Sequence, residues 1–308
     1  MAIDASGIAL VRPRGERLSE QYDFSELISN LESIDCWLQK LGLSNPDRIR
    51  RYLSNIRRMI EVQKSGGLPE LQRTLPFDEA REIFWSYVEA EEFVRAISAL
   101  RTYDHPDLRT ILRSALKGPA DLFLEKATTK QARDHLFELI MGGRIAAAGY
   151  QPYFNRGADI SFNFATLHVD VECKRPLIEA GLEGLIRKGI DQLEQGKSEL
   201  GIVAVSLSRI IVPGDPGSIP TVPNDEIEAY LDQRFGEIIE PAKRFWESRP
   251  SPRLTGVWFY AFVPVRVFPG PPFYIPARLE RVVSTAKGAH KGLLEMLVQA
   301  LNLGEKRQ

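Results

Sequence analysis

Four polar side chains alternate with apolar ones in the segment LHVDVECK: His168, Asp170, Glu172 and Lys174. In a β-strand, residues two positions apart point to the same face of the sheet. These four side chains therefore share one face, and the apolar residues between them form the other. A lysine next to a glutamate on such a face either is one of several solvent-exposed charges or takes part in a metal site.

The segment DISFNF, at residues 159–164, alternates in the same way, and two residues separate it from the first segment. We expect an antiparallel hairpin, in which the two polar faces coincide only if the numbers of paired residues sum to an odd value. The symmetric register pairs Asn163 with His168 and Asp159 with Glu172, which brings the paired Cβ atoms to about 5 Å. An Ala–Thr connection is not a favoured two-residue turn, but a four-residue loop would preserve this register.

Two carboxylates side by side repel each other, so Asp159 and Glu172 need a compensating charge. Magnesium takes oxygen ligands and is usually held by one or two carboxylates together with water and substrate phosphate. Lys174 beside such a pair can neutralise developing charge or orient an attacking water. This face therefore has the components of a phosphodiester-cleaving centre. The simpler alternative is a solvated hairpin face on which the lysine balances the acids, which is the ordinary pattern of an antiparallel sheet.

The periodicity of the apolar residues divides the chain into two regions. From about residue 22 to 130 the apolar residues recur every three or four positions, and Gly and Pro interrupt this pattern. The pattern predicts five or six helices. We therefore expect an all-helical N-terminal region over residues 1–120 and a mixed α/β domain over residues 121–308. Besides the hairpin, the second region is predicted to hold helices near 131–148, 183–195, 227–245 and 289–301, strands at 200–212 and 256–268, and a surface loop at 213–225.

Several residues that could suggest chemistry are better explained by packing. Cys173 is expected to point into the apolar layer opposite the polar face, where a cysteine packs as a small hydrophobe and does not act as a nucleophile. The segment VWFYAF at residues 257–262 reads as a buried strand. Helical spacing likewise predicts core positions, not a base-stacking platform, for Phe84, Trp85, Tyr87 and Phe93.

Composition sets broad limits on function. The 308 residues are 44% hydrophobic and 26% charged, with a net charge of −1, as is usual for a globular protein. The first residues hold no apolar run of signal-peptide length, and no later stretch reaches the roughly 18 to 20 apolar residues of a membrane span. We therefore expect a cytoplasmic protein without membrane contact. A nucleic-acid partner would have to bind local basic patches on this balanced surface.

Two basic stripes could form such patches. The basic residues of one stripe recur every seven positions in one predicted helix, and those of the other recur every four positions in a second helix. Each set therefore lies along one side of its helix. They could contact phosphates without reading sequence. Equally, each stripe could be a solvated helix face paired with nearby acids. The stripes comprise Arg50, Arg51, Arg57 and Arg58 in the first helix and Arg109, Arg113 and Lys117 in the second.

The order of a helix with an acid, a strand with Asp159, a strand with Glu172-Cys173-Lys174 and a further helix resembles the PD-(D/E)xK nuclease superfamily. That family has the restriction-endonuclease-like fold, a mixed sheet flanked by helices. The resemblance covers roughly residues 130–208 and does not extend to the N-terminal helices. The proline of the family's first half-motif is absent, and the residues GAD stand in its place.

The resemblance implies roles for the hairpin residues. Asp159 and Glu172 would bind Mg2+, or Mn2+ in its place, and Lys174 would activate or position the attacking water. The preceding helix in this family often supplies a further acid, for which Glu138 is our candidate and Asp134 the competitor.

The helix after the lysine often presents a glutamine or a basic residue to the site. Gln192 is our candidate there, with Lys188 on the same face one turn before it.

We therefore expect a magnesium-dependent nuclease that acts on nucleic acid, most readily DNA, with a restriction or phage-defence role by analogy of fold alone. The N-terminal helices would select the substrate, bind a protein partner or restrain the nuclease, and a homodimer would suit cleavage of both strands. One alternative is a catalytically silent nucleic-acid-binding or protein-interaction module on the same fold. Another is an unrelated α/β domain whose hairpin is merely solvated.

Overall fold

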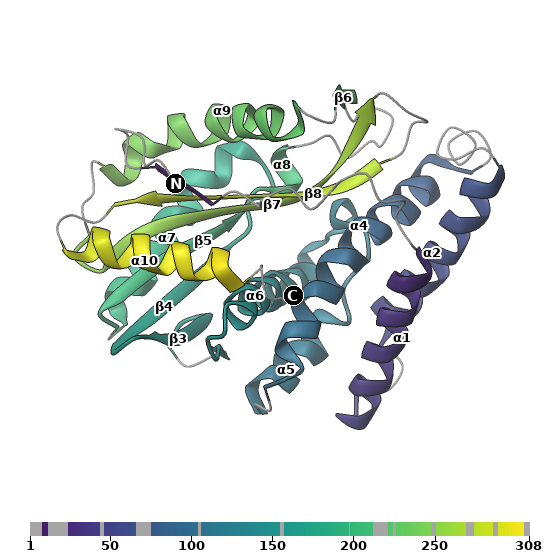
Figure 1. The fold of residues 1–308 in the computed structure, drawn as a ribbon, viewed down its shortest axis with the longest axis horizontal. Helices are drawn as coiled ribbons and strands as arrows, with labels where there is room; N and C mark the ends of the chain where they lie inside the picture. The colour runs from purple at the N-terminus through teal and green to yellow at the C-terminus, as the bar shows by residue number, and fades with distance from the viewer. Residues whose placement is uncertain are drawn as a thin grey trace.

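The computed structural model describes most of the chain and places it in one assembly of helices around a large sheet (Figure 1). The described residues are 8–11, 24–43, 46–65, 75–103, 106–154, 157–196, 198–211, 221–223, 226–247, 251–268, 274–285 and 289–304. Most of the loop expected at 213–225 lies outside these ranges. None of the helices within them is long and apolar enough to cross a membrane.

The predicted N-terminal helices are confirmed where the structure describes them. Their apolar residues recur at three and four and so form one buried stripe, as in α1, where Leu27, Leu31 and Ile34 are buried. Helix α4 is buried on most sides because α1, α2 and α6 all pack against it. Figure 1 shows α1 and α2 at the far end of the molecule from the sheet. The bounds are α1 Phe24–Lys40, α2 Asp47–Ser65, α4 Phe77–Leu100 and α5 Pro106–Ala115.

The remaining chain forms a mixed sheet, which has eight strands within the described residues. Its order is β1-β8-β7-β5-β4-β3-β2, with β6 paired to β7 off this path. Strands β4, β5 and β7 run parallel to one another, β6 is parallel to β7, and the other neighbours are antiparallel. The bounds are β1 Ile8–Val11, β2 Tyr153–Phe154, β3 Ile160–Phe164, β4 Leu167–Lys174, β5 Leu200–Ser206, β6 Thr221–Pro223, β7 Leu254–Phe268 and β8 Tyr274–Ser284.

Helices cover both faces of the sheet, as Figure 1 shows in an edge-on view. On one face, Phe137 of α6 packs against Tyr260 of β7, with ring centroids 6.1 Å apart. On the other, Gly189 of α7 meets Val203 of β5. The expected mixed α/β architecture is therefore confirmed. The helices of this region are α6 Lys130–Ala147, α7 Leu182–Gln195, α8 Ser208–Ile211, α9 Ile227–Glu247 and α10 Ala289–Gly304.

The predicted hairpin register is also confirmed. Strands β3 and β4 pair Asn163 with His168 and Ser161 with Asp170. The connection has only two residues, and Ala165 takes the left-handed conformation that this tight turn requires, with φ of 53°. The left-handed conformation costs roughly 1 kcal/mol in a residue other than glycine. Matching of the two polar faces has therefore set the register in spite of an unfavourable turn residue.

Other expectations need correction. Strand β5 ends at Ser206, not near 212, because Leu207 N donates to Tyr260 O at 2.7 Å and the chain then turns into α8. Four strands, β1, β2, β6 and β8, were not anticipated. Strand β1 pairs with β8, so the region over residues 1–120 is not wholly helical. The domain boundary near residue 120 stays a prediction.

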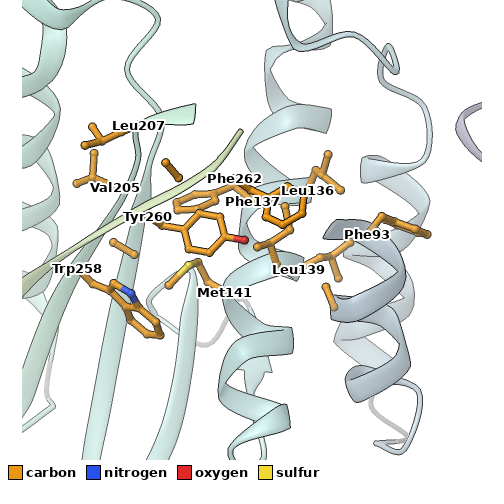
Figure 2. Packing of buried hydrophobic residues seen from close by; sticks show 14 of the residues in the cluster. Phe93, Leu136, Phe137, Leu139, Met141, Val205, Leu207, Trp258, Tyr260 and Phe262 are labelled. Atoms are coloured by element: carbon orange, nitrogen blue, oxygen red, sulfur yellow. The ribbon is translucent and has the colours of Figure 1, made fainter. Parts of the chain in front are cut away.

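The core between α6 and the sheet holds the aromatic residues that the sequence assigned to packing. Figure 2 shows Phe137 and Met141 of α6 facing Tyr260 and Trp258 of β7. The segment 257–262 is buried throughout, as predicted. Phe84, Trp85, Tyr87 and Phe93 of α4 are buried as well. None of these rings is free to stack on a base.

Candidate active site

The ammonium group of Lys174 is the centre of the polar cluster at the end of β4. Its Nζ lies 2.8 Å from Glu172 Oε2 and 3.5 Å from Asp159 Oδ2. Glu172 and Lys174 are only 2% and 8% exposed, whereas the side chain of Asp159 is 28% exposed. The three residues that the motif predicted therefore lie together, and Asp159 is the one most open to solvent.

The hairpin ladder is what holds Asp159 in this position. Ile160 pairs with Val171, so the next residues outward, Asp159 and Glu172, are neighbours across the strands. The Asp159 carboxylate also accepts a hydrogen bond from the backbone N–H of Cys173, between Oδ2 and N at 2.7 Å. An acid anchored to the neighbouring strand keeps one oxygen engaged and leaves the other available to a ligand.

Glu138 of α6 lies near enough to the cluster for the charges of Asp159, Lys174 and Glu172 to act on it, without a recorded hydrogen bond to them. It is 6% exposed, and its Oε2 has no hydrogen-bond partner. Burial raises the pKa of Glu138 to about 8, and the negative charges of Asp159 and Asp134 raise it further, against the opposing effect of Lys174. Asp134, the competing acid, already binds Lys130 at 2.5 Å and Arg175 at 3.3 Å. Glu138 thus remains the better candidate of the two.

The electrostatics of the cluster favour a bound cation. Burial raises the pKa of Glu172 to about 7, and the nearby Asp159 charge adds to the rise, while Lys174 opposes it. For Lys174, burial lowers the pKa, but the charge of Asp159 and the hydrogen bond to Glu172 outweigh it and the net shift is upward. Lys174 is therefore cationic at neutral pH. Asp159 and Glu172 both contact this single ammonium group, and Glu138 senses its charge, so added positive charge would stabilise the ionised forms of all three carboxyl groups.

Helix α7 closes over Lys174 through a glycine. A Cβ on Gly189 would lie 2.9 Å from Val203 Cγ1 and 3.4 Å from Lys174 Cε, so only a glycine permits this approach. Gln192, one turn later, is half-buried, and its Oε1 has no hydrogen-bond partner. Lys188 is exposed and forms no ion pair with any described residue. The structure places α7 against the site, but it records no contact from Gln192 to the charged residues.

The rest of the polar hairpin face forms a separate cluster near the turn. His168 Nε2 lies 3.3 Å from Asp170 Oδ1, and Ser161 donates to the same oxygen at 2.7 Å. The alternating stripe is therefore divided, with Glu172 and Lys174 in one cluster and His168 and Asp170 in the other. Cys173 packs against the core as expected, and burial raises the pKa of its thiol well above the usual range.

The two basic stripes differ in whether their side chains form ion pairs. Every arginine of the α2 stripe forms an ion pair with an acid, which matches the solvated-face alternative. In the second stripe, Arg109 and Arg113 of α5 and Lys117, two residues after its end, are exposed and have no ion pair among the described residues. The α2 pairs are Arg50 with Asp47, Arg51 with Glu82, Arg57 with Glu32 and Arg58 with Glu79.

In the part of the chain that the structure describes, no three His, Cys, Asp or Glu side chains converge closely enough to form a ready-made metal site. Comparison of the chain with protein-family models, with curated proteins and with solved structures finds no match. The function is therefore argued from the geometry of the cluster.

Two features of the site escaped sequence reasoning. The first is Gly189, although an interior helical glycine is a signal because it costs about 1 kcal/mol relative to alanine. The second is the engagement of Asp134 by Arg175, which involves residues 41 positions apart. No local pattern could have revealed that pair.

Proposed function

We propose that the protein is a metal-dependent nuclease that hydrolyses phosphodiester bonds, with DNA as the substrate to test first. The observation that carries this proposal is the position of Lys174 Nζ between the carboxylates of Glu172 and Asp159 at the end of β4. The order of elements supports it, because α6 with Glu138, the β3–β4 hairpin and α7 follow one another as in the PD-(D/E)xK resemblance.

The donor set fits a hard divalent cation such as Mg2+ or Mn2+. Asp159 and Glu172 would hold it, and Glu138, whose Oε2 is buried without a partner, would add a third carboxylate. When bound, the cation would stabilise negative charge on the phosphoryl oxygens. The elevated pKa values of Glu172 and Glu138, about 7 and about 8, fit this assignment, since burial and the neighbouring carboxylates raise them and a bound cation would oppose both effects.

The lysine would act as a cation and not as a base. Its raised pKa keeps Nζ protonated, so it can donate hydrogen bonds to an attacking water or to a phosphate oxygen. A carboxylate that titrates near neutrality is the better proton acceptor at this site. Glu172, which already contacts Lys174, would then orient the lysine as well as bind the metal.

A second candidate function is a nucleic-acid-binding or protein-interaction module without catalysis. One observation favours it: Lys174 already binds the Glu172 oxygen that a metal would need, at 2.8 Å. In this case metal would bind weakly, and loss of Lys174 would leave binding of the partner unchanged.

Cleavage of mixed DNA and RNA substrates with Mg2+ or Mn2+ tests the proposal. We would compare the wild type with Lys174→Met, which keeps the apolar stem, with Asp159→Asn, and with Lys40→Ala on the exposed side of α1 as a control. Loss of one charged group that stabilises the transition state typically costs about 100-fold or more in rate. Cleavage by all four proteins at equal rates, or by none of them, would refute the assignment of the site.

A further inference from the structure

A second polar pocket lies on the α6 side of the sheet, where the parallel strands β4 and β5 end. It is lined by Arg133 of α6, Arg175 just after β4, and Ser208 and Arg209 of α8. Leu136, Phe137 and Phe262, which Figure 2 shows, form its apolar wall. In open α/β sheets, ligands bind outside the carboxyl ends of the parallel strands, which is where this pocket lies.

Arg133 supplies the strongest sign of a missing ligand. It is 3% exposed, and its Nη1 donates to Glu89 of α4. Its Nε and Nη2, however, are buried and have no hydrogen-bond partner. A buried charged donor without an acceptor is costly, so these two donor nitrogens require an acceptor that the described residues do not provide.

The acids around the pocket do not neutralise its arginines. Glu89 is shared, because its Oε1 accepts from Arg48 and Tyr52 and its Oε2 from Arg133. The positive charge of Arg48 and Arg175 is one of the causes, after burial, that hold the pKa of Arg133 well below its usual range.

The other two arginines share Glu125: Arg175 binds it at 2.9 Å, and Arg209 lies 3.6 Å from the same carboxylate. Arg175 also lies 3.3 Å from Asp134, but Lys130 binds the other oxygen of that carboxylate. Glu92 also lines the pocket, but burial raises its pKa to about 7, so it carries only part of a negative charge at neutral pH. The pocket therefore favours an anion.

We propose that the Arg133–Arg175–Arg209 pocket binds a phosphate group. Guanidinium groups present pairs of N–H donors that match two oxygens of a phosphate. The Ser208 hydroxyl accepts a hydrogen bond from Phe262 N at 3.0 Å, so its own proton is free to be donated to a ligand. Arg209, whose side chain is 21% exposed, is the most open of the three arginines and marks the entrance.

This site differs from the candidate active site, although Arg175 directly follows Lys174. The residues that line the pocket include none of Asp159, Glu172, Lys174 and Glu138. The phosphate could belong to a small molecule or to the end of a nucleic-acid strand. The inference does not rest on the proposed nuclease function, because a protein without catalysis would keep the pocket.

Isothermal titration of the full chain with inorganic phosphate, in metal-free buffer at constant ionic strength set with NaCl, tests the pocket. We expect saturable binding that Arg209→Gln weakens about tenfold or more, as for loss of a hydrogen bond to a charged group. Arg133→Gln should abolish it, and Arg209→Gln keeps the test valid if loss of the buried Arg133 prevents folding. Arg234→Gln, which removes a surface arginine of α9, is the matched control and should change nothing.

Two further titrations identify the source of the phosphate. Tighter binding of a 5′-phosphorylated oligonucleotide than of its 5′-hydroxyl counterpart, lost in Arg209→Gln, would assign the pocket to a strand end. Competition by a nucleoside monophosphate, with no difference between the two oligonucleotides, would assign it to a free ligand. Absence of saturable phosphate binding, or equal affinity in the wild type and Arg209→Gln, would overturn the inference. Neither result depends on whether the chain cleaves DNA.

Discussion

The buried carboxyl group of Glu138 should make the free energy of unfolding depend on pH, and this prediction needs no knowledge of the substrate. The pKa of Glu138 is raised from 4.5 to about 8 in the folded chain. Between these two values the folded state holds a proton that the unfolded state has released. Stability should therefore fall as pH rises from about 4.5 to about 8 and then level off. Replacement by Gln removes this titration while keeping the size of the side chain.

The size of the effect follows from the same numbers. Each pH unit between the folded and unfolded pKa values corresponds to about 1.4 kcal/mol, so the shift of Glu138 sets an upper limit of roughly 5 kcal/mol. Relaxation and water entry reduce this figure, and we expect Glu138→Gln to gain roughly 2 to 4 kcal/mol relative to the wild type between pH 5 and pH 8. The neighbouring Glu172, with a pKa of about 7, should add a smaller effect of the same sign.

Urea denaturation at pH 5, 6, 7 and 8 in the presence of a chelator measures this difference. Glu26→Gln, an exposed acid on α1, is the control and should follow the wild type at each pH. Mg2+ in place of the chelator should restore stability to the wild type mainly at pH 8, because a metal binds the ionised carboxylates. A constant difference between Glu138→Gln and the wild type across this range would refute the reasoning about the buried carboxyl group.

Two further predictions concern packing. Gly189→Ala should destabilise the fold by roughly 1 to 2 kcal/mol, because the close approach to Val203 and Lys174 outweighs alanine's better helix propensity. In a double-mutant cycle, Gly189→Ala should cost less stability when Val203 is also replaced by Ala. Additive effects of the two substitutions would contradict the contact. Ala165→Gly should stabilise the chain by roughly 1 kcal/mol in thermal or urea unfolding, because glycine accepts the positive φ of this turn without strain; a loss of stability would contradict that account.

The sequence by itself determined the elements whose pattern is local. Alternation with a period of two set the face and the register of the β3–β4 hairpin, because a slip of one residue would move Asp170 and Glu172 onto the apolar face that now holds Val171. Apolar residues spaced three and four positions apart likewise predicted helices α6 and α7 and the face that each one buries. The proximity of Asp159, Glu172 and Lys174 follows from this register and needed no long-range information.

Only the tertiary structure decided the contacts between distant segments. Strand β1 joins the sheet through β8, more than 260 residues later, and no local pattern encodes such a pairing. Glu138 and Asp134 lie one turn apart on α6, and the ion pair with Arg175 distinguishes their roles. The arginine pocket brings together α6, α8 and the end of β4 in the same way. Periodicity assigns a side chain to a face of its own element, whereas packing between elements determines which charges meet there.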